Sequence, residues 1–271
     1  MAVTSLPEET QHTVGYSLAS GVAVIELRWP AANNALDVTM RHGLLAAVRR
    51  VQSDGDAVRA VLLTAQGGNF SVGQELKEHA RALEDHPASA FASIGNEYNP
   101  LVQILQSLPQ PVVVAVEGAC VGAGLGLALC ADLRVAAEDA SFATAFAGRG
   151  LAADTGLSAS LTRAVGPSRA AALLLLGDQL EAGDALAWGL VHRVVASGKA
   201  GSEGFALARR LAKGPTVAFR EVKSLLRGAG APLDTVLERE ALAQSVLGAT
   251  RDHRDAVRAL LSQRNPHFSG R

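Results

Sequence analysis

The feature that most constrains this chain is a buried strand that runs into a glycine-rich turn and then into an apolar helix. The run Val112–Val116 is apolar, Glu117-Gly118 ends it, and glycines follow at positions 122, 124 and 126 before Cys130. Such a turn leaves free backbone N–H groups at the positive end of a helix. Between Gly118 and Cys130 no side chain carries a carboxylate, hydroxyl or imidazole. The segment can therefore hold an oxygen atom but cannot itself move a proton.

The glycine spacing does not match a dinucleotide-binding fingerprint, G-x-G-x-x-G. Gly122 and Gly124 supply its first half, but the third position is occupied by Leu127. The fingerprint needs all three glycines to bring the pyrophosphate close to the main chain. Two interpretations of these glycines stay open: a turn that binds an oxygen atom, or glycines that allow tight helix packing.

Composition and charge exclude several classes of protein. The net charge of −1 provides no basic face for nucleic acid, and no apolar run is long enough to span a membrane. Cys120, Cys130 and the scattered histidines form no metal-ligand spacing, so we expect no metal. The first residues show no secretory signal pattern. We therefore expect a cytoplasmic protein, with residues 1–12 as a mobile lead.

Hydrophobic periodicity predicts alternating strands and helices, and hence an α/β fold with a mostly parallel sheet. Residues 75–87 are charged and are left unassigned, and the last third of the chain is almost entirely helical, which favours subunit association. Strands are expected at 16–20, 22–27, 60–64, 112–116, 133–136 and 191–195, and helices at 37–51, 88–107, 167–176, 181–188, 203–212, 215–227, 233–248 and 251–262.

A second glycine turn follows the strand expected at Ala60–Thr64. It runs from Gly67 to Lys77 and again leads into the polar start of a helix. Two such turns on parallel strands can aim backbone N–H groups at one point. Two convergent N–H groups form an oxyanion hole, which suits a thioester carbonyl that becomes an enolate.

At these residues the chain resembles the crotonase (enoyl-CoA hydratase/isomerase) superfamily, and the resemblance covers nearly its whole length. The family's motifs P-x-x-x-N-A-L and F-x-A-G-x-D-L-K are matched by Pro30–Asp37 and Phe70–Lys77. Further matches are Pro111–Gly118, continuing through Gly122 to Asp132, and Gly150–Gly156.

The resemblance implies a spiral of ββα units over residues 13–200. It also implies a C-terminal helical region, 201–271, that builds a homotrimer or a hexamer of two trimers. The expected ligand is an acyl-CoA thioester. Coenzyme A is then part of the substrate, and no separate cofactor is expected. Fatty acid metabolism is the corresponding context.

Site residues carry over by position in these motifs. The oxyanion donors are the backbone N–H groups of Gln74 and Ala123, where Ala123 replaces the family's usual glycine. The family's lysine after Pro30 is Ala31 in this chain. The positions expected to bind the substrate and its CoA are Ala35, Val72, Leu76, Lys77, Gly122 and Phe146.

The chain departs from the family's hydratases at both catalytic glutamates. Those positions are Gly126 and Phe146. Adding water to an enoyl thioester needs a base to take one proton and an acid to deliver another. The usual pair is absent, which argues against a standard hydratase.

Asp154 is the remaining candidate acid–base group. The segment Ala153-Asp154-Thr155-Gly156 resembles the P-D-S/T-G segment of ring-epoxide and enoyl-CoA isomerases, which use one aspartate to shuttle a proton. Apolar surroundings would raise its pKa toward neutrality. The residues alone also fit a simpler role, in which Asp154 caps a helix that begins near Gly156.

We therefore expect a double-bond or ring isomerase, an enzyme, and three alternatives stay open. The first is a hydratase with non-standard acid–base residues. The second is an enzyme like the aryl-CoA dehalogenases, which use the Asp154 position as a nucleophile but carry a tryptophan at Phe146 and a histidine base not identified in this chain. The third is a non-catalytic acyl-CoA-binding subunit.

Overall fold

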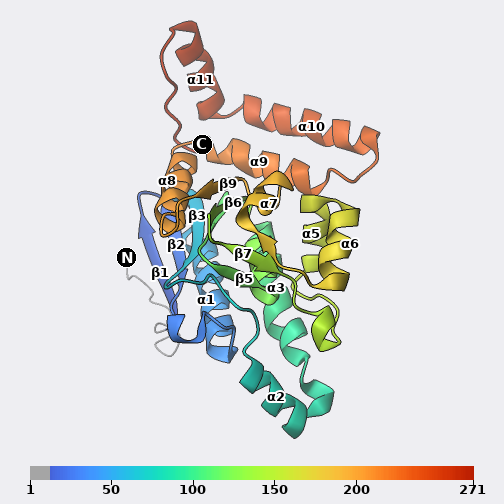
Figure 1. Ribbon diagram of the computed structural model, residues 1–271. Coiled ribbons are helices and arrows are strands. Elements are labelled where there is room, and N and C mark those ends of the chain that lie inside the picture. Colours follow the sequence, from blue (N-terminus) through green and yellow to red (C-terminus); the bar gives the residue numbers. More distant parts are fainter. Residues whose placement is uncertain (1–12) are drawn as a thin grey trace.

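The computed structural model describes residues 13–271, which form two sheets surrounded by helices (Figure 1). The larger sheet has the order β1-β2-β3-β4-β6-β9, and only its β1–β2 pair is antiparallel. A smaller sheet has the order β5-β7-β8. The strands are β1 Val14–Ala19, β2 Val22–Leu27, β3 Ala60–Ala65, β4 Val112–Val116, β5 Ala119–Val121, β6 Leu133–Ala137, β7 Ser141–Ala143, β8 Leu180–Glu181 and β9 Arg193–Val195.

The central strands are buried on both faces. All five residues of β4 are buried, as are the first four of β3, which is why both read as continuous apolar runs rather than as alternating ones. The helix α8, Ala200–Ala212, packs against β3, β4 and β6. Its Gly204 permits this close approach, because a Cβ there would lie 3.0 Å from the Ala115 side chain.

Two consecutive units show how the chain builds both sheets. β4 continues into β5 of the small sheet and then into α4, Ala123–Ala128. β6 likewise continues into β7 and, after a loop, into α5, Leu157–Val165. Each unit therefore delivers a strand to each sheet and then a helix.

The predicted elements are mostly present, and the short strands β5, β7 and β8 are additional to them. Two further differences concern helices. Residues left unassigned form the helix α2, Leu76–Asp85. The single helix expected over 88–107 is wrong: a 3₁₀ turn at Pro87–Ser89 and a π-helix at Ile94–Tyr98 precede α3, Asn99–Ser107. Pro100 has no N–H for the helical ladder, and the N–H of Asn99 bonds the Ile94 carbonyl in the wider pattern.

The remaining helices are α1 Val38–Asp54, α5, α6 Pro167–Leu176, α7 Ala182–Ala187, α9 Thr216–Arg227, α10 Leu233–Gly248 and α11 Arg251–Leu261. Figure 1 shows α9 to α11 at one end, with α10 and α11 projecting from the body. In residues 13–271 no helix is long and apolar enough to cross a membrane. The lead predicted for residues 1–12 lies outside the described residues, and the predicted division at residue 200 stays a prediction.

Candidate active site

The loop that carries Gln74 is held between two neighbouring segments. On one side the Phe70 N–H donates to the Glu117 carbonyl at 2.8 Å, and the Val121 N–H donates to the Ser71 carbonyl at 2.9 Å. On the other side the Leu36 N–H donates to the Gly73 carbonyl at 2.8 Å. The two glycine turns seen in the sequence are therefore joined by main-chain hydrogen bonds.

The backbone N–H of Gln74 takes no part in these hydrogen bonds. Leu36 and Gln74 form a parallel bridge in which Leu36 bonds the residues on either side of Gln74. The N–H of Gln74 therefore faces away from Leu36. A Cβ placed on Gly73 would lie 3.3 Å from the Ala123 nitrogen, so the two expected donors lie on touching segments. In residues 13–271 neither amide has a protein acceptor.

Two asparagines hold these turns together, and their role was not identified from sequence. The buried side chain of Asn34 donates to the carbonyls of Gln66 and Asn69 at 2.9 and 2.8 Å and accepts from the Trp29 N–H. The Asn69 side chain accepts from the Ala119 N–H at 2.8 Å. The sequence signal for Asn34 is the pair Asn33-Asn34 in the first motif. Its hydrogen-bond partners, Gln66 and Asn69, lie more than 30 residues further along the chain, so the contact could not be predicted.

Asp154 is a half-buried carboxylate with unused bonding capacity. Its Oδ1 atom is buried and has no hydrogen-bond partner in the part of the chain that the structure describes. Burial raises the pKa of this carboxyl above its ordinary value, and the Thr155 hydroxyl opposes part of that shift. An unpaired buried oxygen is unusual in a folded protein, and a catalytic role is one recognised reason for it.

The capping role for Asp154 is wrong. Helix α5 begins at Leu157 with Gly156 as its N-cap, and no side chain caps it. The Leu157 N–H does bond Asp154, but at the backbone carbonyl, 2.9 Å away. The carboxylate of Asp154 therefore makes no cap hydrogen bond to α5.

Thr155 places the Asp154 segment against α4. Thr155 has φ +50°, an uncommon conformation for a β-branched residue, and its hydroxyl donates to the Asp154 carbonyl at 2.8 Å. A Cβ added to Gly126 would overlap that hydroxyl. Gly126 lies three residues after Ala123, which is roughly 4.5 Å along a helix axis. Helix α4 therefore contacts the Asp154 segment at Gly126 and carries the expected donor Ala123 at its first residue.

Tyr98 of the π-helix approaches the site from another side. Burial raises the pKa of its phenol, and the negative charge of the nearby Asp154 adds to that shift. A Cβ on Gly156 would lie 3.7 Å from Val102 of α3. The Asp154 segment therefore lies between α4 and the helical stretch that contains Tyr98.

The expected CoA-contacting positions fall around the same loops. Ala35 and Gly122 are buried, Val72 is partly exposed, and Leu76 and Lys77 are exposed in the first turn of α2. Their contact with CoA stays a prediction.

Neither position of the two hydratase glutamates carries a carboxylate, and position 126 has no room for one. Gly126 faces Thr155, as described. Phe146 is part of the hydrophobic core. The buried thiols of Cys120 and Cys130 have raised pKa values because burial disfavours the thiolate, which makes them poor nucleophiles.

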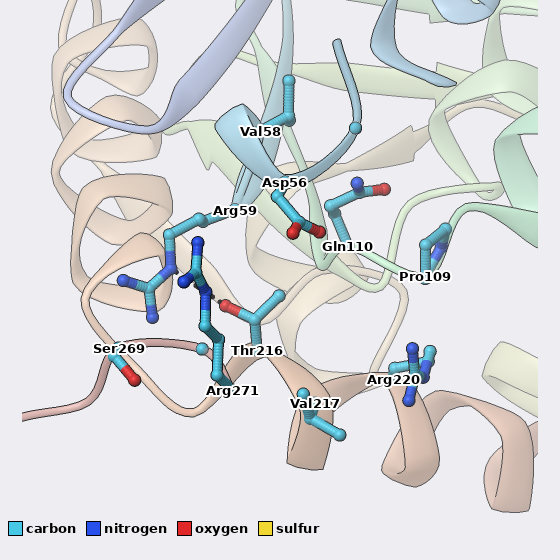
Figure 2. A pocket seen from close by; sticks show the side chains of 12 residues that line it. Asp56, Val58, Arg59, Pro109, Gln110, Thr216, Val217, Arg220, Ser269 and Arg271 are labelled. Carbon is cyan, nitrogen blue, oxygen red and sulfur yellow. Dashed lines mark hydrogen bonds between the residues drawn. The ribbon is translucent and has the colours of Figure 1, made fainter. Parts of the chain in front are cut away.

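A separate pocket lies where the C-terminal helices meet the start of β3 (Figure 2). Arg59 crosses this junction and donates to the Thr216 hydroxyl and to the carbonyls of Gly214 and Phe268. None of the predicted site residues lines this pocket. The hydrogen bonds of Arg59 join the C-terminal segment to the residue that precedes β3. The pocket is distinct from the Asp154 site.

Comparisons with known proteins place these features in a family. Residues 17–271 match the family model described as enoyl-CoA hydratase/isomerase. A probable enoyl-CoA hydratase of Rhodobacter capsulatus is 39% identical, covering 96% of this chain and 99% of that protein. The 1,2-epoxyphenylacetyl-CoA isomerase of Escherichia coli is 36% identical, covering 93% and 96%. A solved structure from Mycobacterium abscessus, provisionally named enoyl-CoA hydratase/isomerase, has a TM-score of 0.93 and 55% identity, covering 95% and 100%.

Proposed function

This chain belongs to the enoyl-CoA hydratase/isomerase (crotonase) family, with the family's α/β fold and C-terminal helices, and from that premise we propose that it isomerises an acyl-CoA thioester. The isomerisation moves a double bond or opens a strained ring, and Asp154 carries the proton. The single observation that supports this most is the buried, unpartnered Asp154 Oδ1 beside the helix that begins at Ala123.

In this mechanism the thioester oxygen accepts hydrogen bonds from the amides of Gln74 and Ala123. The Asp154 carboxylate removes a proton from one carbon of the acyl chain, and the electron pair moves onto the thioester oxygen as an enolate. The two amides stabilise the charge that develops there. Asp154 then returns the same proton to another carbon, so no net proton or water is consumed.

The raised pKa of Asp154 suits both halves of this step. A more basic carboxylate removes a carbon-bound proton more readily, and the resulting acid returns it to the enolate. One group serves as base and acid in turn, which agrees with the absence of carboxylates at Gly126 and Phe146.

The substrate is a CoA thioester that needs no additional cofactor. The CoA portion is proposed to lie along Ala35, Val72, Gly122 and the first turn of α2, with the ammonium of Lys77 near a phosphate and Phe146 bordering the acyl group. The proposal also includes a cytoplasmic location and a homotrimer or hexamer.

Hydration is the second candidate, because the Rhodobacter capsulatus relative is named a probable hydratase. It would require an acid–base pair other than the glutamates absent from positions 126 and 146. The isomerase name of the Escherichia coli relative supports the first candidate. A dehalogenase-like reaction and a non-catalytic subunit rank lower, since the former needs a histidine base and the latter leaves the unpaired Asp154 carboxylate without a role.

The test is to assay the purified protein with 3-enoyl-CoA, a ring-1,2-epoxide acyl-CoA and crotonyl-CoA. Double-bond or ring isomerisation with only trace hydration supports the proposal. Brisk hydration of crotonyl-CoA would replace it with the hydratase candidate. Binding of the thioesters without any turnover would favour the non-catalytic subunit.

A further inference from the structure

A buried arginine lies directly behind the loop that carries Gln74. Arg41 of α1 is only 3% exposed, and each arm of its guanidinium has its own acceptor. The Nε donates to Glu97 at 2.5 Å, Nη1 to the Leu36 carbonyl at 2.8 Å and Nη2 to Glu78 at 2.8 Å. The guanidinium also lies over the Tyr98 ring, 5.5 Å from its centre.

The bond to the Leu36 carbonyl connects Arg41 to the oxyanion donor. That carbonyl also accepts from the Glu75 N–H at 3.4 Å, while the Leu36 N–H bonds the Gly73 carbonyl at 2.8 Å. The two main-chain groups of Leu36 therefore bond the residues on both sides of Gln74. Arg41 and the more distant Tyr98 hydroxyl, 3.5 Å away, both donate to the Leu36 carbonyl. Arg41 is therefore bonded to the residue whose pairing orients the Gln74 amide.

The bond to Glu78 connects Arg41 to α2. The second oxygen of Glu78 accepts from the Val38 N–H at 2.8 Å, at the first residue of α1. Glu78 thus joins α2 to α1 through both of its oxygens. Figure 1 shows α2 at the end of the molecule away from α10 and α11, where it packs mainly on the Pro87–Ser89 turn.

We propose that Arg41 is a positioning residue for the oxyanion donor of Gln74, acting through the Leu36 carbonyl, and that Glu78 uses the same guanidinium to set the position of α2. This inference rests on the proposed function. A planar guanidinium serves three acceptors in fixed directions, which an ammonium on a flexible stem cannot do. Arg41 does not touch the substrate, so its effect is expected mainly on kcat.

The experiment compares Arg41→Lys with Arg50→Lys. Arg50 is a matched control on the same helix, with its own ion pair to Asp54 at 2.7 Å and its own aromatic neighbour, Tyr16. Removing an oxyanion donor outright costs about 10²–10³ in kcat, so a misplaced donor is expected to cost about tenfold or more, with KM changed little. Arg50→Lys is expected to leave both constants near wild type.

A spectroscopic readout separates positioning from general weakening of the fold. A bound conjugated thioester such as cinnamoyl-CoA absorbs at longer wavelength when its carbonyl oxygen accepts strong hydrogen bonds. The shift is expected in wild type and in Arg50→Lys, and is expected to shrink in Arg41→Lys. Glu78→Gln is expected instead to raise KM for CoA thioesters, with a smaller effect on kcat.

Glu97→Gln is a second test that remains usable if Arg41→Lys fails to fold. It weakens one of the three guanidinium bonds but keeps Arg41 in place. A smaller fall in kcat and a partial loss of the spectral shift are expected. If wild type turns over the thioester with a clear shift, and Arg41→Lys and Glu97→Gln retain both, the positioning role is overturned while the proposed function stands. If wild type neither binds nor shifts the probe, the proposed function itself fails.

Discussion

Gly126 and Thr155 compete for one space: a Cβ at position 126 would overlap the Thr155 hydroxyl. Thr155 holds the Asp154 carbonyl and is 2% exposed. A glutamate at position 126 and the present course of residues 154–156 are therefore mutually exclusive. The absence of a glutamate at position 126 and the presence of Asp154 are therefore linked. Thr155 occupies the space that a side chain at position 126 would need, and the backbone of Asp154 is bonded to Thr155.

Gly126→Ala is expected to destabilise the fold by about 1–3 kcal/mol, the usual range for overpacking a close-packed core, and to lower kcat by displacing Asp154. Chemical denaturation and steady-state assays measure the two effects. Gly183→Ala in α7 is the matched control, since a Cβ there meets nothing within 4 Å. A fully stable and active Gly126→Ala would show that Thr155 does not need this space.

Asp154→Asn is expected to lower kcat for isomerisation by about 10²–10⁴, the usual contribution of a general base, and to leave the affinity for acyl-CoA nearly unchanged. The amide keeps the shape of the side chain but cannot take a proton. Assays of 3-enoyl-CoA conversion and calorimetry of thioester binding test both statements. Full activity in the variant would assign the proton transfer to another group.

The raised pKa of Asp154 predicts opposite effects of pH on activity and on stability. Activity needs the carboxylate, so kcat falls as the pH drops through the raised pKa, above the range of an ordinary aspartate. Between the unfolded and folded pKa values the folded state binds more protons, so this group's contribution to stability decreases as the pH rises. Asp154→Asn is therefore expected to be more stable than wild type at pH 7.

Thermal unfolding of both proteins across pH measures this contribution. The difference in stability between wild type and Asp154→Asn is expected to disappear at pH values below the ordinary aspartate pKa. There Asp154 is protonated in both the folded and the unfolded state of the wild type. An acid limb of the activity profile at the ordinary aspartate pKa would contradict the expected shift.

Ala123→Pro is expected to lower kcat by about 10²–10³ because it removes one oxyanion donor. Ala123 is the first residue of α4, a position where proline is tolerated because its missing N–H makes no helical bond. Circular dichroism and calorimetry would establish that folding and thioester binding persist. Unchanged kcat in a folded variant would remove Ala123 from the proposed oxyanion hole.

The C-terminal helices predict self-association. Leu260 and Leu261 of α11 are 78% and 81% exposed, and Leu226, Leu233, Leu237, Leu242, Val246 and Val257 also present apolar surface. Leu260→Glu with Leu261→Glu is expected to convert a homotrimer or hexamer to monomers, since burying an unpaired carboxylate costs several kcal/mol. Light scattering measures this, with Leu18→Glu on β1 as the control. A monomeric wild type at micromolar concentration would refute the predicted assembly.

Part of this protein could be predicted because the signal is local. The apolar runs of β3 and β4 reveal buried strands, and the glycines around positions 68 and 122 mark the turns that follow them. The motif positions also selected Gln74, Ala123 and Asp154 as candidates. Helices α6 and α9 to α11 were found from periodicity, because each is long enough to repeat its apolar face.

Short strands and the π-helix could not be predicted. β5, β7 and β8 span two or three residues each, too few for a periodic pattern, and they exist only because they pair with one another. The π-helix Ile94–Tyr98 ends just before Asn99-Pro100. It places Glu97 and Tyr98 beside Arg41, and no local sequence pattern predicts this contact.

The sequence by itself determined the longer strands, the turns that follow them and the kinds of group that chemistry requires, since these follow from composition and spacing within short segments. Only the tertiary structure decided the surroundings of Asp154. It left the Asp154 Oδ1 atom without a partner in residues 13–271 and α5 without a side-chain cap, set Thr155 in the space above Gly126, and connected Arg41 to the Leu36 carbonyl. Those relationships join residues far apart in the chain, and they arise from packing and desolvation, which exist only once the segments have come together.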